Sequence, residues 1–172
     1  MLANPLELAT YIGIEIDEDI YNVCVNNFRN FEKERLITSK TFLIYGNILD
    51  YKDIYPVTHV YSFNVGMPPY IIFYIIGLCV YTSSVKVLCL FKKDKDTLNS
   101  IFYPIGLIDH IHNDDDFPKE YTLKMQSDSF MCYFIPLTVK RKELIKSRIG
   151  TVFDKINKTK KKNISSDIIK FN

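Results

Sequence analysis

The first half of the chain alternates between short apolar runs and a segment with helical periodicity. The run at Tyr11–Ile16 is largely apolar on both faces, which is typical of a strand in a buried parallel sheet. The segment that follows has apolar residues at helical spacing to about Glu34, and Asp17 or Glu18 can cap its N-terminus. A second apolar run, Thr41–Tyr45, predicts the next strand.

The second half continues this alternation and then changes character. His59–Asn64 and Val85–Phe91 predict two further buried strands, on either side of an apolar helix at Tyr70–Tyr81. Near the end, Glu120–Gln126 and Phe130–Leu137 predict an antiparallel hairpin. Alternating strands and helices with a closing hairpin indicate a protein of the α/β class.

The apolar stretch Met67–Phe91 also has to be weighed as a membrane span. A helix that crosses a bilayer needs about 20 apolar residues in succession. This stretch is interrupted by Pro68, Pro69 and Lys86. The sequence therefore favours a buried helix followed by a buried strand, with no transmembrane segment.

Charge divides the 172-residue chain into two parts. Residues 140–172 hold 11 basic and 3 acidic residues, and the rest carries a net charge of −6. The sequence thus predicts a domain at 1–139 and a basic tail at 140–172. The densest clusters, Lys140–Lys142 and Lys160–Lys162, are typical of a nuclear address or of an arm that binds nucleic acid or chromatin. A solvated, disordered tail without such a role is the alternative.

Four cysteines, Cys24, Cys79, Cys89 and Cys132, lie in apolar contexts. None has the Cys-x-x-Cys spacing or a histidine at ligand spacing, so we expect no zinc site. Free thiols fit a reducing, intracellular compartment, either cytoplasmic or nuclear. The N-terminus also lacks the basic start and long apolar run of a signal peptide.

The end of the first predicted strand is the main candidate for chemistry. A strand that runs into a carboxylate and then a helix is typical of a nucleotide-binding domain, in which the carboxylate binds ribose hydroxyls. Glu15 is favoured for this role, whereas Asp17 is favoured as a helix cap. Asn47 follows Gly46, so a plain turn explains it equally well.

The order of these segments resembles that of class I S-adenosylmethionine-dependent methyltransferases. The resemblance covers residues 1–137 and rests on the segments Gly13–Asp17, Gly46–Asp50, Tyr61–Pro69 and Tyr121–Leu137. Two of them, Gly-Ile-Glu-Ile-Asp and Tyr-Ser-Phe-Asn, are most similar to the histone-lysine methyltransferases of the disruptor-of-telomeric-silencing type. The resemblance implies a Rossmann-like sheet that ends in an antiparallel hairpin.

The resemblance also implies that S-adenosylmethionine is the cofactor. Glu15 would accept hydrogen bonds from its ribose hydroxyls, and Ile16 would lie on the adenine face. Asn47 and Ile48 would meet the adenine edge, by side chain and by backbone amide.

A second group of residues would act at the reacting centre. Asn64, as the catalytic residue, and Val65, as a cofactor-binding residue, would lie beside the transferred methyl group and the substrate. Met67–Tyr70 is similar to the Asn-Pro-Pro-Tyr motif of amino-methyltransferases, but the first residue is Met. The amide that holds a target amine is therefore missing, and the two prolines are favoured as structural residues.

One part of the methyltransferase pattern is absent from the sequence. The methionine part of the cofactor needs a first strand followed by a Gly-x-Gly turn, and no Gly-x-Gly occurs among the six glycines. The sheet is thus predicted to be truncated at its first strand. Three explanations compete: a fragment of a methyltransferase, a degenerate member of the class, or a false resemblance.

Three functions follow from these expectations. The first is a methyltransferase that acts on protein or nucleic acid. The second is a non-catalytic interaction subunit built on a degenerate methyltransferase-like fold. The third is another kind of nucleotide-binding α/β protein that uses Glu15 for ribose.

Overall fold

The computed structural model of the chain describes residues 10–37, 39–92, 105, 119–125, 128–159 and 167–171. The chain divides into two compact units. The first unit contains residues 1–50 and 161–172, and the second contains residues 51–160. This division differs from the predicted one, because residues 140–172 contribute to both units.

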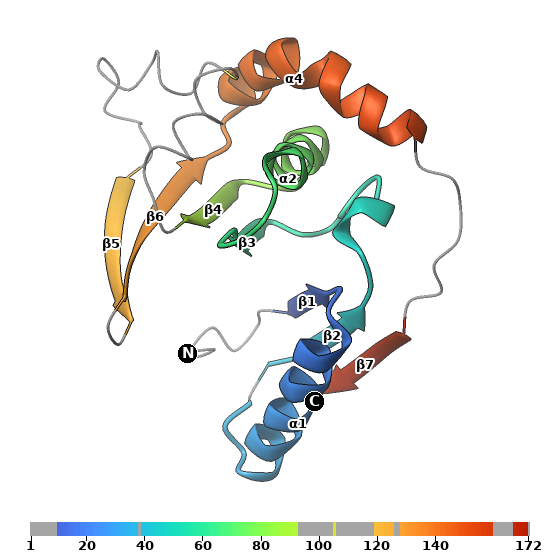
Figure 1. Cartoon of the computed structure of the whole chain (residues 1–172), viewed down its shortest axis with the longest axis vertical. Coiled ribbons are helices and arrows are strands. Elements are labelled where there is room, and N and C mark those ends of the chain that lie inside the picture. The colour runs from blue at the N-terminus through green and yellow to red at the C-terminus, as the bar shows by residue number, and fades with distance from the viewer. Residues whose placement is uncertain are drawn as a thin grey trace. The chain divides into compact units, whose positions relative to one another are not determined.

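The first unit is a three-stranded sheet with one long helix (Figure 1). Its elements are β1 (Tyr11–Glu15), α1 (Glu18–Lys33), β2 (Thr41–Tyr45), the short 3-10 helix η1 (Ile48–Asp50) and β7 (Asp167–Phe171). The strand order is β1-β2-β7, in which β1 and β2 are parallel and β7 is antiparallel to β2. The sequence did not predict β7.

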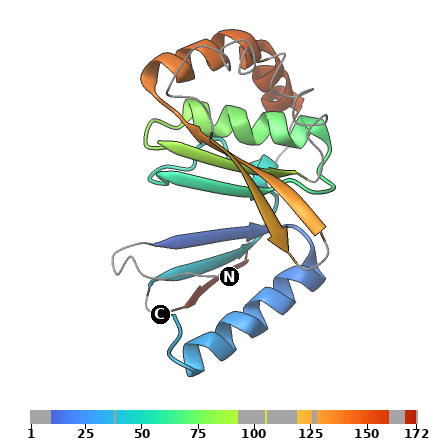
Figure 2. The ribbon, with the colours of Figure 1, turned by 90° about the vertical axis from the view of Figure 1, so that its left-hand side faces the viewer.

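Helix α1 covers one face of this sheet (Figure 2). It begins after Asp17, whose carboxylate accepts a hydrogen bond of 3.0 Å from the amide of Ile20. Asp17 is therefore the N-cap, as predicted. Tyr21 and Val25 then pack against Leu43 of β2 and form the buried core of the unit.

In its described residues, the second unit is a four-stranded mixed sheet with helices α2 and α4 on one face (Figure 2). Its elements are β3 (His59–Phe63), α2 (Pro69–Tyr81), β4 (Val87–Lys92), β5 (Lys119–Met125), β6 (Asp128–Pro136) and α4 (Val139–Thr159). The strand order is β3-β4-β6-β5, in which β3 and β4 are parallel and β6 is antiparallel to both of its neighbours. The predicted hairpin is confirmed as β5–β6, and the α/β class is confirmed.

Helix α2 is the centre of the second unit. Ile72, Tyr74 and Ile76 are fully buried, and Leu88 and Leu90 of β4 are buried as well. The apolar stretch at 67–91 is thus a buried helix followed by a strand, as predicted. Among the described residues, no helix has the length and apolar character that a membrane crossing requires.

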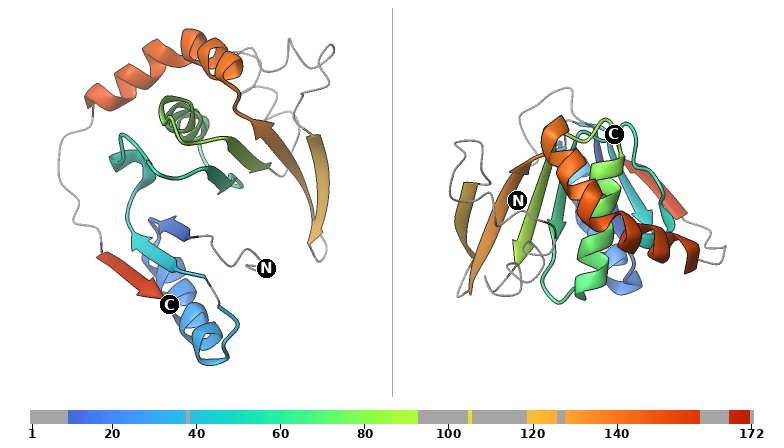
Figure 3. Two further views of the ribbon diagram at one scale, coloured as in Figure 1. Left: turned by 180° about the vertical axis from the view of Figure 1, so that it is seen from behind. Right: turned by 90° about the horizontal axis from the view of Figure 1, so that it is seen from above.

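Helix α4 packs against α2 and crosses it (Figure 3). Its side chains Ile145 and Ile149, one helical turn apart, are buried. Thr138 precedes the helix, and its hydroxyl accepts a hydrogen bond from the amide of Arg141. Residues 139–159 are therefore an ordered part of the second unit and not a solvated tail.

Candidate functional site

Glu15 and Asn47 lie together at one edge of the first unit. Glu15 ends β1, and its Cα partner in the register is Tyr45, the last residue of β2. The amide of Gly46 donates a hydrogen bond of 2.9 Å to the carbonyl oxygen of Glu15. Because β1 and β2 are parallel, their carboxyl ends share one edge of the sheet, which is where open α/β sheets bind ligands.

The carboxylate of Glu15 is held close to the start of α1. Its Oε1 atom accepts hydrogen bonds from the amides of Ile16 and Asp17, at 2.8 and 2.9 Å. Among the described residues, Oε2 has no hydrogen bond. Glu15 is partly exposed and Ile16 is 60% exposed, so a ligand at this edge can reach both side chains.

Asn47 organises the turn that follows β2. Its Oδ1 atom accepts a hydrogen bond of 2.9 Å from the amide of Leu49, and its carbonyl accepts one from the amide of Asp50. Ile48 opens η1, and both Asn47 and Ile48 are partly exposed. The predicted turn is thus confirmed, and the contact of Asn47 with adenine stays a prediction.

Asn64 lies in the second unit, directly after β3, and is fully buried. Its Nδ2 atom donates hydrogen bonds to Ser62 Oγ at 2.9 Å and to Met67 Sδ at 3.5 Å. Its carbonyl accepts a hydrogen bond of 3.2 Å from the amide of Met67, which closes a tight turn through Val65 and Gly66. The side chain of Asn64 therefore holds this turn together.

The predicted residues fall into two groups. Glu15, Ile16, Asn47 and Ile48 are brought together in the first unit, although Glu15 and Asn47 are 32 positions apart. Asn64 and Val65 belong to the second unit. The catalytic role of Asn64 stays a prediction.

Two side chains of the basic cluster Lys140–Lys142 form hydrogen bonds to backbone carbonyls of the second unit. The guanidinium of Arg141 donates to the carbonyl of Pro136 at 2.5 Å, and the ammonium of Lys142 donates to the carbonyl of Thr82 at 2.8 Å. Lys140 is exposed. The cluster at Lys160–Lys162 lies outside the described residues.

A polar network at the C-terminal end of α2 was not predicted. The hydroxyl of Thr82 donates a hydrogen bond of 2.7 Å to Asp53, and the amide of Ile54 donates to the same hydroxyl. The hydrogen bond from Thr82 lowers the pKa of Asp53 below its ordinary value. Asp53 is exposed, so this network fastens a loop onto α2 and does not form a buried site.

The described residues show no metal centre, and the comparisons with known proteins point to no function. The four cysteines are free, and within the described ranges no group of three His, Cys, Asp or Glu side chains is placed to hold a metal ion. Compared with known protein families, curated proteins and solved structures, the chain has no match. The edge formed by Glu15 and Asn47 is thus the geometry from which a function can be argued.

Proposed function

We propose that this chain carries the adenosine-binding part of an S-adenosylmethionine-dependent methyltransferase domain that acts on protein or nucleic acid. The observation that carries the proposal is the position of Glu15 beside the Asn47 turn, at the shared carboxyl edge of two parallel strands. A carboxylate at the end of one strand and a polar turn at the end of the next suit a ribose and its attached base.

The residues at this edge fit adenosine. Glu15 keeps Oε2 free of hydrogen bonds to described residues, so that this atom can accept one from a ribose hydroxyl. The exposed side chain of Ile16 offers an apolar contact for an adenine face. Because two backbone amides already fix Glu15 Oε1, this side chain loses little conformational entropy when a ligand binds.

The strand arrangement of the second unit also supports the proposal. In the order β3-β4-β6-β5, only β6 runs against the other strands. A reversed strand between the last two forward strands is the arrangement that the resemblance to methyltransferases implies for the closing hairpin. The strand order supports the proposed fold only and does not indicate a substrate.

The methionine part of the cofactor has no matching residues in the sequence, since no Gly-x-Gly turn is present. When bound, S-adenosylmethionine supplies a reactive methyl group, so the protein contributes mainly alignment and exclusion of water. The chain's own residues therefore account for adenosine binding and not for the complete cofactor site.

Titration calorimetry with S-adenosylmethionine tests the proposal. We expect binding to the unmodified chain and about tenfold weaker binding to Glu15→Gln, because the amide loses the charge that strengthens a bond from ribose. Glu18→Gln is the matched control, since Glu18 is an exposed acid in the first turn of α1. Equal affinities of Glu15→Gln and Glu18→Gln for S-adenosylmethionine would show that Glu15 is not part of the binding site.

The same titration separates the two alternatives. Absence of any adenosine ligand binding would favour a non-catalytic interaction subunit, a reading supported by the missing Gly-x-Gly turn and the buried side chain of Asn64. Tighter binding of NAD or ATP than of S-adenosylmethionine would favour another nucleotide-binding protein. Methyl transfer to histones or nucleic acid then tests the substrate class.

A further inference from the structure

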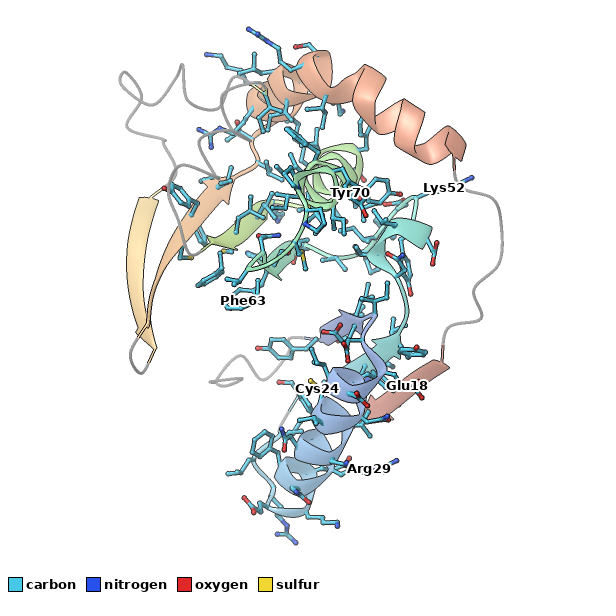
Figure 4. All side chains as sticks on the ribbon, viewed as in Figure 1. Glu18, Cys24, Arg29, Lys52, Phe63 and Tyr70 are labelled. Atoms are coloured by element: carbon cyan, nitrogen blue, oxygen red, sulfur yellow. The ribbon has the colours of Figure 1, made fainter. Side chains whose placement is uncertain are left out.

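Helix α4 presents two cations to solvent. Lys140 and Arg148 are both exposed, and among the described residues neither side chain takes part in a hydrogen bond or an ion pair. Eight positions in a helix correspond to a rise of about 12 Å and a rotation of about 80°, so both belong to one outward side of α4. This side, defined by Lys140 and Arg148, is called the basic face. Figure 4 shows nitrogen-tipped side chains at the start of α4 that project away from α2.

The other described cations of α4 are already bound within the chain. Arg141 and Lys142 donate hydrogen bonds to backbone carbonyls of the second unit. Lys146 forms an ion pair of 2.9 Å with Glu143. Among the described side chains of α4, Lys140 and Arg148 are therefore the cations that remain for a partner outside the chain.

The positive charge of the basic face is not balanced within the helix. In the part of α4 whose side chains the structure describes, the acidic residue is Glu143, and it is bound to Lys146. Over its whole length, α4 contains seven basic and two acidic residues. Lys160–Lys162 follow it directly in the sequence. Such an excess of one charge along a single element attracts a polyanion.

The buried side of α4 holds the basic face in place. Ile145 and Ile149 are buried, and the helix packs against α2. A cation on an ordered helix loses less conformational freedom on binding than a cation in a disordered tail. The structure thus turns part of the predicted basic tail into a rigid, charged surface.

The burial of these isoleucines argues against a lipid bilayer as the partner. A helix that lies on a membrane inserts an apolar side into the bilayer below its basic residues. In α4 that side, Ile145 and Ile149, is buried inside the second unit, and Leu144 is partly buried. Among the described side chains of the helix, Val139 is the large apolar one that is exposed. A single valine offers little apolar area for insertion.

The spacing of the two cations fits double-stranded DNA. The major groove of DNA is about 12 Å wide and lies between two rows of phosphates. A helix that crosses this groove can place Lys140 near the phosphates of one strand and Arg148 near those of the other. The major groove of duplex RNA is narrow and deep, so the same pair of cations fits it less well.

From these observations we propose that the basic face of α4 binds the phosphate backbone of double-stranded DNA across its major groove. Lys140 and Arg148 donate charge-assisted hydrogen bonds to phosphate oxygens. Contacts to phosphates carry no sequence information, so the binding is independent of base sequence. It requires neither Glu15 nor S-adenosylmethionine. The inference therefore goes beyond adenosine binding, and either proposal can fail without the other.

Fluorescence anisotropy of the full chain with a labelled DNA duplex tests the proposal. The duplex has about two helical turns, on the order of 20 base pairs, and is titrated at about 50 to 200 mM salt. We expect binding that weakens linearly on a plot of log affinity against log salt concentration. A second duplex of unrelated sequence should bind within about twofold of the first.

The double variant Lys140→Gln/Arg148→Gln locates the binding. Each contact with a phosphate contributes about 0.9 to the salt slope, so the double variant should lower the slope by about 2. Its affinity at about 50 mM salt should fall by about tenfold or more. Lys140→Gln alone and Arg148→Gln alone should each lower the slope by about 1, so the test does not depend on folding of the double variant.

Arg29→Gln/Lys33→Gln is the matched control. Arg29, labelled in Figure 4, and Lys33 are an exposed arginine and lysine of α1 in the first unit. This double variant removes the same charge from another helix, and glutamine suits a helix as well as lysine does. Its salt slope should be unchanged and its affinity for DNA should stay within about twofold.

Three outcomes would overturn the proposal. The first is absence of DNA binding at about 50 mM salt. The second is a salt slope that Lys140→Gln/Arg148→Gln leaves unchanged, or that both double variants lower equally. The third is tighter binding of a duplex RNA, or of vesicles of phosphatidylserine and phosphatidylcholine, that the α4 double variant abolishes. That result would show that another polyanion occupies the basic face.

Discussion

The ammonium of Lys142 in α4 donates a hydrogen bond of 2.8 Å to the carbonyl of Thr82, at the C-terminal end of α2. A second bond of 3.3 Å runs to the carbonyl of Ser83. The last carbonyls of a helix lack hydrogen-bond donors within the helix and carry partial negative charge. A cation at this position therefore supplies a donor and offsets the charge. Lys142 is 9% exposed, and its two hydrogen bonds attach α4 to the C-terminal end of α2.

Lys142→Met should destabilise the second unit by about 2 kcal/mol, because the buried carbonyl of Thr82 and the partly buried carbonyl of Ser83 lose a charged donor while the apolar stem is retained. Urea denaturation followed by circular dichroism measures the change. Lys140→Met, which alters an exposed residue of the same cluster, should change the stability by less than about 0.5 kcal/mol. Similar losses of stability in both variants would show that the stability depends on the overall charge and not on the contact of Lys142 with Thr82.

Asp53 should make stability depend on pH in the acid range. The hydrogen bond from Thr82 lowers the pKa of Asp53 in the folded chain, so the unfolded chain binds more protons below about pH 4. The contribution is therefore complete above the unfolded pKa and is lost as the pH falls through the lower, folded value. We expect the thermal midpoint of the unmodified chain to fall more steeply below about pH 4 than that of Asp53→Asn.

Asp50→Asn is the control for that comparison, because Asp50 is an exposed carboxylate at the end of η1. Its midpoint should follow the unmodified chain over the same pH range. Parallel curves for the unmodified chain and Asp53→Asn would contradict a role for the bond to Thr82.

Gly66→Ala should destabilise the turn after β3. Gly66 has a φ of 78°, a conformation that costs a residue with a Cβ about 1 kcal/mol or more. An added Cβ would meet no atom within 4 Å, so the cost comes from the backbone alone. Urea denaturation measures it, and Gly66→Asn, which tolerates this conformation better, should lose less.

Cys79 should resist alkylation in the folded chain. It is fully buried, and burial raises its pKa to about 12, so almost no reactive thiolate forms at pH 8. With iodoacetamide, mass spectrometry should show Cys24, which is partly exposed, labelled well before Cys79. Equal labelling rates would indicate that α2 opens readily.

Local patterns were sufficient to predict most of the strands and helices. Thr41–Tyr45 matches the observed strand, and the strands and helix expected at 11–16, 59–64 and 70–81 differ from the structure by one residue at an end. These elements are marked by apolar runs and bounded by caps, glycines or prolines, which are visible within a few residues of sequence.

The elements in residues 140–172 were missed because their signals are weak or distant. Among the side chains of α4 that the structure describes, the buried apolar ones are Ile145 and Ile149, and they stand among many charges, which suggested a solvated tail. A strand such as β7, Asp167–Phe171, is specified by its pairing with β2, more than 120 positions earlier. The capping threonine at position 138 and the spacing of the two isoleucines were the available signals for α4.

Part of the arrangement around the candidate site follows from the sequence, while the roles of its residues stay predictions. Parallel pairing of β1 and β2 brings Glu15 and the Asn47 turn to one edge, as the order of motifs suggested. The burial of Asn64 was not foreseen, because it depends on Ser62 and Met67 turning inward around its amide. Such packing is set by the tertiary structure and not by the motif.

The central claim is that the first unit binds the adenosine part of its ligand through Glu15. The most direct measurement is titration calorimetry with S-adenosylmethionine, S-adenosylhomocysteine, adenosine and methionine. We expect the three adenosine compounds to bind within about tenfold of one another, each to be weakened by Glu15→Gln, and methionine to give no heat. Binding of methionine alone, or affinities for the adenosine compounds that Glu15→Gln leaves unchanged, would contradict the claim.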